Sequence, residues 1–285
     1  MPVPAFSDIA KPSNDLINKD FYHATAAALE VKLKADNAVS FTAKGTSAHE
    51  GATNASLEIK KGLNIKGATL TGAWNTANMT SEKIELDNVI ADGLKVELLN
   101  AFSPAAGNKG QKANLYFKQA AFNGRLFADY TPTGAFSATV DGVFGHEGFL
   151  VGGEAGYDVQ KAAITKYSAA VGYQTPQYSA AVQATNSLSI FTASYYQMVN
   201  AQVEAGAKAA WDAKTSGPVG IELGGKYKID PESFAKGKIN DRGIVSLAYN
   251  TKVKQGFTFG IGASFDSQKL NEAGHKIGTT FTFEG

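Results

Sequence analysis

Apolar and polar residues alternate with a period of two through most of this chain. In one segment, Val203, Ala205 and Trp211 alternate with Glu204 and Lys208. Successive side chains of a β-strand point to opposite faces, so the pattern predicts strands with one apolar and one polar face. The same alternation recurs in residues 165–173, 219–229, 257–265 and 276–283.

Short turn-forming clusters such as Asp230-Pro231 and residues 241–243 separate these runs at a uniform spacing. We therefore expect a single β domain over residues 26–285. A tilted membrane strand takes about 9–11 residues, so each strand with its turn needs about 14. The domain then has room for about 18 or 19 strands, and a sheet of that size must close on itself or split.

The composition helps to distinguish a soluble β-sandwich from a membrane barrel. Only 19% of the residues are charged, 30 are glycine, and residues 167–203 contain no charge at all. A soluble β-sandwich would expose its polar face to water, whereas a membrane barrel turns apolar side chains to lipid and polar ones to a wet lumen. The scarcity of charge favours the barrel. The mean hydropathy of −0.17 is compatible with it, because such a barrel averages the two faces.

Several functional classes are disfavoured. A net charge of +1 argues against a nucleic-acid partner, and the absence of cysteine excludes disulfide staples and thiolate metal sites. We expect no secretory signal peptide and no transmembrane helix. The histidines show no metal-ligand spacing, and no phosphate-binding loop or catalytic triad can be identified. We predict no enzyme, no metal and no cofactor.

Residues 1–25 do not alternate. Ile9, Leu16 and Ile17 form one stripe of an amphipathic helix, and Pro12 is expected in its first turn. A helix this short needs support from the rest of the protein. It either caps one end of the barrel or packs against the pore wall, carrying Asp15 and Lys19 into the lumen.

Lysine is the remaining chemical feature. Of the 27 basic residues only Arg125 and Arg242 are arginines. In a barrel surrounded by lipid, a lysine within a strand must point inward or lie at the rim. A wet pore lined by such cations predicts weak anion selectivity. Lysines within or beside predicted strands are Lys60, Lys95, Lys118, Lys208, Lys226 and Lys236.

At this point particular motifs resemble a known family. The segment from Tyr227 to Tyr249 resembles the signature of eukaryotic porins, the voltage-dependent anion channels of the mitochondrial outer membrane. Residues 14–23 (NDLINKDFYH) resemble the fungal branch of that family. Further matching motifs lie at residues 74–76, 93–95, 145–148 and 275–278.

The resemblance implies a barrel of about 19 mostly antiparallel strands, closed by one parallel pair, with a short N-terminal helix inside the pore. It implies a voltage-gated, weakly anion-selective channel of the mitochondrial outer membrane. The solutes implied are small ions, ATP, ADP, phosphate and respiratory substrates. The partners implied are the lipid bilayer, these nucleotides and metabolite anions, and the outer-membrane import and assembly machinery, and the resemblance also allows a homo-oligomer.

The resemblance also assigns residues. Those implied in selectivity are Asp15, Lys19, Lys60 and Lys95. Those implied in nucleotide binding are Lys11, Lys19, Ile244, Val245, Ser246, Gly262, Ala263, Ser264, Phe265 and Asp266. Residues of the last strand that resemble the signal read by the assembly machinery are Lys276, Gly278, Phe281 and Phe283.

The sequence differs from animal members of the family at one position, and roles of that position do not carry over. Animal members carry a membrane-facing acidic residue two positions before the matching tryptophan, and here that position is Gly72. Two alternatives stay open: the related protein-import pore, which usually has additional N-terminal sequence and acidic presequence-binding patches, and a soluble β-sandwich binding module.

Overall fold

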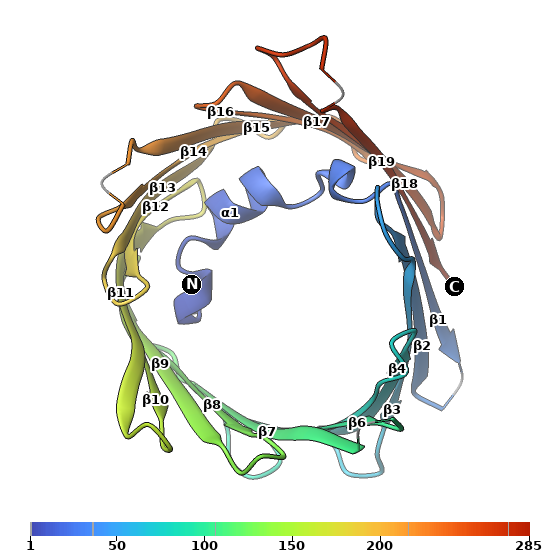
Figure 1. The fold of residues 1–285 in the computed structure, drawn as a ribbon, viewed down its shortest axis with the longest axis vertical. Coiled ribbons are helices and arrows are strands. Elements are labelled where there is room, and N and C mark those ends of the chain that lie inside the picture. Colours follow the sequence, from blue (N-terminus) through green and yellow to red (C-terminus); the bar gives the residue numbers. More distant parts are fainter. Residues whose placement is uncertain (1, 36, 106, 216, 273) are drawn as a thin grey trace.

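The computed structural model describes residues 2–35, 37–105, 107–215, 217–272 and 274–285, and they form one closed β-barrel (Figure 1). The helices are η1 (Phe6–Asp8), α1 (Lys11–Asn18) and η2 (Tyr22–Ala24). The strands are β1 (Ala27–Ala35), β2 (Val39–Ser47), β3 (Asn54–Gly62), β4 (Ala68–Asn75), β5 (Thr80–Asp87), β6 (Leu94–Ser103), β7 (Gly107–Lys118), β8 (Phe122–Tyr130), β9 (Phe136–His146), β10 (Phe149–Asp158), β11 (Ala163–Gln174), β12 (Tyr178–Thr185), β13 (Ile190–Met198), β14 (Val203–Asp212), β15 (Gly220–Asp230), β16 (Ser233–Asn240), β17 (Ile244–Lys254), β18 (Phe257–Asp266) and β19 (Lys276–Glu284).

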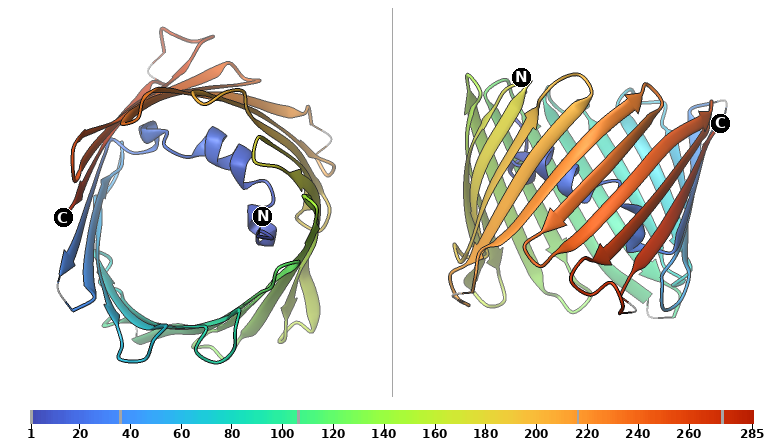
Figure 2. Two further views of the ribbon diagram at one scale, coloured as in Figure 1. Left: turned by 180° about the vertical axis from the view of Figure 1, so that it is seen from behind. Right: turned by 90° about the horizontal axis from the view of Figure 1, so that it is seen from above.

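The 19-stranded sheet closes through its first and last strands. Each strand pairs antiparallel with its neighbours in sequence, whereas β1 and β19 pair parallel, with Ala27 opposite Thr279 and Lys32 opposite Glu284. The strands are tilted steeply against the barrel axis (Figure 2), as closure of a barrel requires. This architecture confirms the predicted fold class, including the odd strand number.

The alternation assigns one face of each strand to the lumen. Glu204 and Lys208 of β14 lie opposite Lys226 and Glu222 of β15, all on the inner face. The alternate residues Ala205, Ala207 and Trp211 of β14 point outward. A shift of register by one residue would turn these charges into the bilayer, where a midplane lysine costs about 2–4 kcal/mol. The polar face of the sequence pattern is therefore the pore wall.

The N-terminal segment, residues 2–25, lies inside the barrel (Figure 1). Helix α1 begins at Lys11 with Pro12 in its first turn and packs against β13, β14 and β15. Of the two expected positions, the structure shows the helix on the pore wall. None of the helices within the described residues is long and apolar enough to cross a membrane.

The charge-free segment 167–203 can now be explained. Its outer residues, such as Val171 and Val182, are about half exposed on the outside of the barrel. Its inner residues Ala170 and Ala181 are only 3% and 4% exposed, because they pack with Val3, Phe6 and Ile9 in a buried apolar cluster. The outer face of this wall meets the bilayer, and part of its inner face is covered by the N-terminal segment, so little of it needs charge.

Candidate functional site

Glycines on the lumen wall make room for the N-terminal segment. A Cβ atom added at Gly206 would lie 2.8 Å from the side chain of Leu16, and one at Gly224 would lie 3.3 Å from Ile17. The segment thus fits into a track of glycines at van der Waals distance, which any larger residue would fill. The other glycines of the track are Gly145 below Val3, Gly152 below Phe6, Gly172 below Ile9, and Gly260, Gly262 and Gly278 around Tyr22.

Polar side chains of the wall fix the segment along its length. Asn123 Nδ2 donates to the carbonyl oxygen of Val3 at 3.0 Å, and Arg125 Nη1 donates to Ser7 Oγ at 3.2 Å. Further along, Ser13 Oγ donates to the carbonyl oxygen of Ala207 at 3.3 Å. Near the other end, Asn250 Nδ2 donates to Tyr22 Oη. These contacts hold the segment against the wall, so that only its remaining polar groups can contact solutes in the lumen.

Lys236 of β16 caps the C-terminal end of α1. Its ammonium donates hydrogen bonds to the carbonyl oxygens of Asp15 at 3.0 Å and Lys19 at 2.7 Å, and it lies 5.1 Å from the ring centre of Phe21. The last carbonyls of a helix lack partners within the helix and carry partial negative charge, so a cation here is favourable. Lys236 is only 5% exposed. It therefore acts on the helix rather than directly on passing ions.

Asp15 and Lys19 lie together at one cavity. This cavity of about 420 Å³ opens between the end of α1 and the wall, and Tyr196, Glu204 and Lys226 also line it. The side chain of Lys19 is exposed to the lumen. Lys11, at the other end of α1, is also exposed and lies 3.8 Å from Asp8.

Lys60 and Lys95 lie on β3 and β6, on the part of the wall that α1 leaves uncovered (Figure 1). Both reach the same carboxylate, since Lys60 Nζ and Lys95 Nζ lie 3.0 Å and 2.9 Å from Glu85. The predicted selectivity residues therefore form two groups on different sides of the lumen, Asp15 with Lys19 and Lys60 with Lys95.

The two segments implied in nucleotide contact are neighbours in the sheet. Ile244–Ser246 of β17 pairs with residues 264–266 of β18, and Ser246 Oγ donates to Ser264 Oγ at 3.2 Å. Ser246 is 2% exposed, and Gly262 lies directly below the backbone of Tyr22. By alternation, Val245, Ala263 and Phe265 point to the outer face, away from these serines. Of these residues, Gly262 therefore lies beneath the N-terminal segment, whereas Val245, Ala263 and Phe265 face away from the lumen.

The base of the N-terminal segment holds two perturbed titratable groups. Burial and the negative charge of Asp20 raise the pKa of Tyr22 to about 12, against the opposing hydrogen bond from Asn250. Burial lowers the pKa of His23, and the positive charges of Lys238 and Lys276 and the neighbouring His49 lower it further. His49 Nε2 is 2.8 Å from the carbonyl oxygen of His23, while His23 Nδ1 is buried and has no hydrogen-bond partner among the described residues.

Sequence reasoning missed the carboxylates. Asp141, 4% exposed, accepts hydrogen bonds from both Arg125 Nε and Arg125 Nη2, and Glu85 accepts from two lysines. The alternation places all of these on the lumen face. A search for opposite charges on that face of nearby strands would have indicated candidates, but the alternation does not fix the exact register between strands, which decides which charges meet.

Comparison with known proteins agrees with this architecture. The sequence profile of the eukaryotic porin family matches residues 3–278. The chain is 56% identical to the mitochondrial outer membrane protein porin of Neurospora crassa, over 100% of both chains. It is 36% identical, over 100% of both chains, to the non-selective voltage-gated ion channel 1 of Saccharomyces cerevisiae. With the rat protein named non-selective voltage-gated ion channel VDAC1 it shares 30% identity, over 99% of this chain and 98% of that protein.

A distant solved structure resembles the fold alone. The structure of a triple mutant of Rhodopseudomonas blastica porin superposes with a TM-score of 0.53 at 9% identity, covering 81% of this chain and 90% of that one. At that identity the likeness extends to a closed barrel and not to particular residues.

Proposed function

The chain belongs to the eukaryotic porin family and forms a voltage-gated channel of the mitochondrial outer membrane, and we propose that this channel prefers anions and passes nucleotides, phosphate and respiratory substrates. The matching sequences and the closed barrel carry the family and the channel. The charges and the cavity of the lumen support the anion preference and the solutes.

The charge of the lumen wall supports the anion preference. Five of the exposed lysines in the lumen form no ion pair within the described residues, and their ammonium groups remain available to the solution in the pore. Fixed cations along a narrow aqueous path raise the local concentration of anions, and salt screens the effect. The lysines in question are Lys19, Lys34, Lys118, Lys252 and Lys276.

The cavity beside α1 supports a place for anionic groups of the solute. Lys19 and Lys226 line it together, and Glu204, which lies 3.2 Å from Lys228, is its wall carboxylate. Phosphate groups of a nucleotide would be attracted to the lysines and repelled by Asp15 and Glu204. We expect weak, transient contact there rather than tight binding. Lys11 is exposed on the same segment, whereas the buried Ser246 offers no open surface to a nucleotide in the lumen.

Conductance in a planar bilayer tests the proposal. With potassium chloride at two concentrations across the membrane, we expect step conductances and a reversal potential of the sign that chloride sets. Replacing chloride with ATP should leave a measurable inward or outward current carried by the nucleotide. A reversal potential on the potassium side would contradict the anion preference, and the absence of an ATP current would contradict the proposed substrates.

The last strand supports a proposal about assembly. Gly278 accommodates the backbone of Tyr22, while Phe281 and Phe283 contact Phe259 and Phe257 of β18 at ring distances of 5.4 Å and 4.8 Å. The strand that the assembly machinery would read is thus also the strand that closes the barrel. Substitution of Phe281 by a polar residue should reduce insertion by isolated mitochondria, and unchanged insertion would contradict the assignment.

A further inference from the structure

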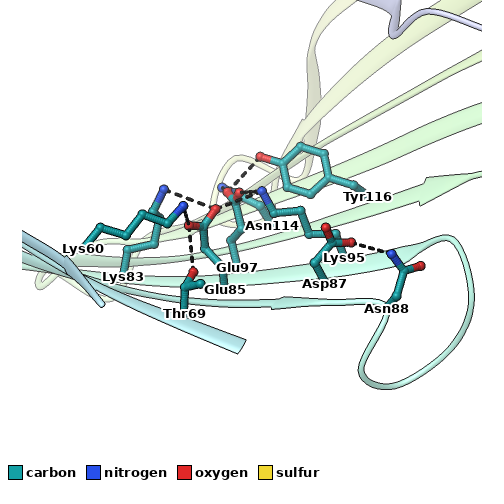
Figure 3. A network of polar contacts seen from close by, with 10 residues as sticks. All are labelled: Lys60, Thr69, Lys83, Glu85, Asp87, Asn88, Lys95, Glu97, Asn114 and Tyr116. Carbon is teal, nitrogen blue, oxygen red and sulfur yellow. Dashed lines mark hydrogen bonds and ion pairs between the residues drawn. The ribbon is translucent and has the colours of Figure 1, made fainter. Parts of the chain in front are cut away.

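One carboxylate on the uncovered wall binds three lysines from three strands (Figure 3). Glu85 of β5 is 6% exposed. Lys60 Nζ lies 3.0 Å from its Oε2, while Lys95 Nζ and Lys83 Nζ lie 2.9 Å and 3.4 Å from its Oε1. Thr69 Oγ1 also donates to Oε2 at 3.2 Å. Both carboxylate oxygens are therefore fully engaged.

A second carboxylate extends the cluster to the next strands. Glu97 of β6 is 8% exposed, and its Oε1 lies 2.7 Å from Lys95 Nζ. Its other oxygen accepts hydrogen bonds from Tyr116 Oη at 2.9 Å and Asn114 Nδ2 at 3.3 Å. Lys95 is thus held between two carboxylates, whereas Glu85 is the single carboxylate that binds Lys60 within the described residues.

Burial makes this arrangement stronger than a surface ion pair. The side chain of Glu85 is 8% exposed, and those of Lys60, Lys83 and Lys95 are 44%, 32% and 34% exposed. Charges shielded from water in this way are screened less by salt than exposed ones. The carboxylate holds the lysine side chains against the wall. Its negative charge also reduces the positive electrostatic potential that the three lysines produce in the lumen.

Resting on the anion preference proposed above, we propose that Glu85 is a selectivity-determining residue of the pore: it withdraws the ammonium groups of Lys60, Lys83 and Lys95 from the permeation path. Removing this carboxylate adds one positive charge to the lumen and also frees three lysine arms to extend into it. The anion preference should therefore depend on Glu85 more strongly than on a lumen carboxylate that binds no lysine.

Glu58 provides the matched comparison. It lies on the inner face of β3, opposite Thr42 and Ala73, is exposed, and forms no ion pair within the described residues. Glu85→Gln and Glu58→Gln each remove one negative charge from the inner face, on strands β5 and β3, which β4 separates. In planar bilayers under a salt gradient, both should shift the reversal potential toward that of chloride, and Glu85→Gln should produce the larger shift.

A double-mutant cycle isolates the interaction. Lys60→Gln should reduce the anion preference only slightly in the native channel, where Glu85 already holds Lys60, and more in the Glu85→Gln channel, where Lys60 is free. The control cycle combines Lys60→Gln with Glu204→Gln on β14, across the lumen, and should be additive. Equal shifts for Glu85→Gln and Glu58→Gln, together with additivity of Lys60 and Glu85, would overturn the proposal.

A second pair of variants tests the role of Glu85 if the first variant does not fold. If Glu85→Gln forms no channels, Lys60→Gln is compared with Lys34→Gln, because Lys34 is exposed and forms no ion pair within the described residues. Lys34→Gln should then reduce anion preference more, and the reverse order would overturn the proposal. If the native channel prefers cations while Glu85→Gln still produces the larger shift and couples to Lys60, the role of Glu85 stands and the proposed anion preference fails.

Discussion

The ammonium group of Lys236 donates a hydrogen bond to the carbonyl oxygen of Asp15, joining β16 to a helix that lies 221 residues earlier in the chain. An isolated helix of eight residues is marginal in water, because nucleation costs more than so few hydrogen bonds return. Helix α1 persists because the wall supplies what its ends lack. Lys236 satisfies its terminal carbonyls, and the glycine track accepts its apolar stripe.

Replacing Lys236 with methionine should loosen the N-terminal segment. The change keeps the length of the side chain and removes two hydrogen bonds from a buried ammonium. Hydrogen bonds to charged groups contribute about 1.5–3 kcal/mol each, so the free energy of opening at α1 should fall by roughly that order. Amide hydrogen exchange of residues 11–19 would measure it, and Lys252→Met, which removes an exposed lumen lysine of β17, is the control. Equal exchange in the two variants would contradict the capping role.

Gly278→Ala should displace the base of the N-terminal segment. A methyl group at this position would overlap the carbonyl oxygens of Tyr22 and Thr25, which are backbone atoms and cannot move aside as the end of a flexible side chain would. We expect faster amide exchange over residues 20–25 and a lower unfolding temperature. Gly72→Ala, at a strand glycine with open space around its Cβ position, is the matched control and should change neither quantity. Unaltered exchange in Gly278→Ala would show that the segment can move aside at no cost.

The sequence predicts the barrel well because its strongest signal is local. Alternation such as that of residues 203–211 determines the face of each side chain without knowledge of its neighbours, and Pro12 marks the start of α1 for the same reason. Contacts such as Lys236 with Asp15 depend on where distant strands come together. Nothing in the residues near Lys236 distinguishes it from Lys208 or Lys226, which are also lysines of alternating strands.

The placement of Ser246 illustrates the same limit. A pattern of residues can place β17 beside β18, but it cannot show that Tyr22 and His23 cover this part of the wall. The N-terminal segment can cover these residues only because the closed barrel brings it against β17 and β18. The cluster around Glu85 and Glu97 could not be predicted from the sequence, because the partners of each carboxylate come mainly from other strands, between β3 and β7.

Acidification should weaken the docking of the N-terminal segment through His23. Its pKa in the folded protein lies below the ordinary value of 6.5, because burial, Lys238, Lys276 and His49 all disfavour the charged form. The undocked segment then binds more protons than the docked one. Stability from the neutral form is complete above about pH 6.5 and is lost as the pH falls through the lowered pKa of His23.

Amide exchange of residues 20–25 at several pH values, corrected for intrinsic exchange rates, would measure this dependence. His23→Gln should reduce it, since glutamine does not titrate. An equally steep loss of protection in His23→Gln would contradict this role of His23.

Charge reversal at Lys19 should lower the anion preference of the pore. Lys19 is exposed at the cavity beside α1, and its backbone is held by Lys236, so Lys19→Glu replaces a cation by an anion at a fixed place in the lumen. Lys95→Glu also changes two charge units, but it adds a third carboxylate beside Glu85 and Glu97. Both variants should move the reversal potential under a salt gradient toward that of potassium. Lys95→Glu should in addition lower the unfolding temperature, because it leaves the buried Glu97 without its lysine and places a third carboxylate beside two others. A reversal potential unchanged in either variant would mean that the lysine concerned does not act on the permeating ions.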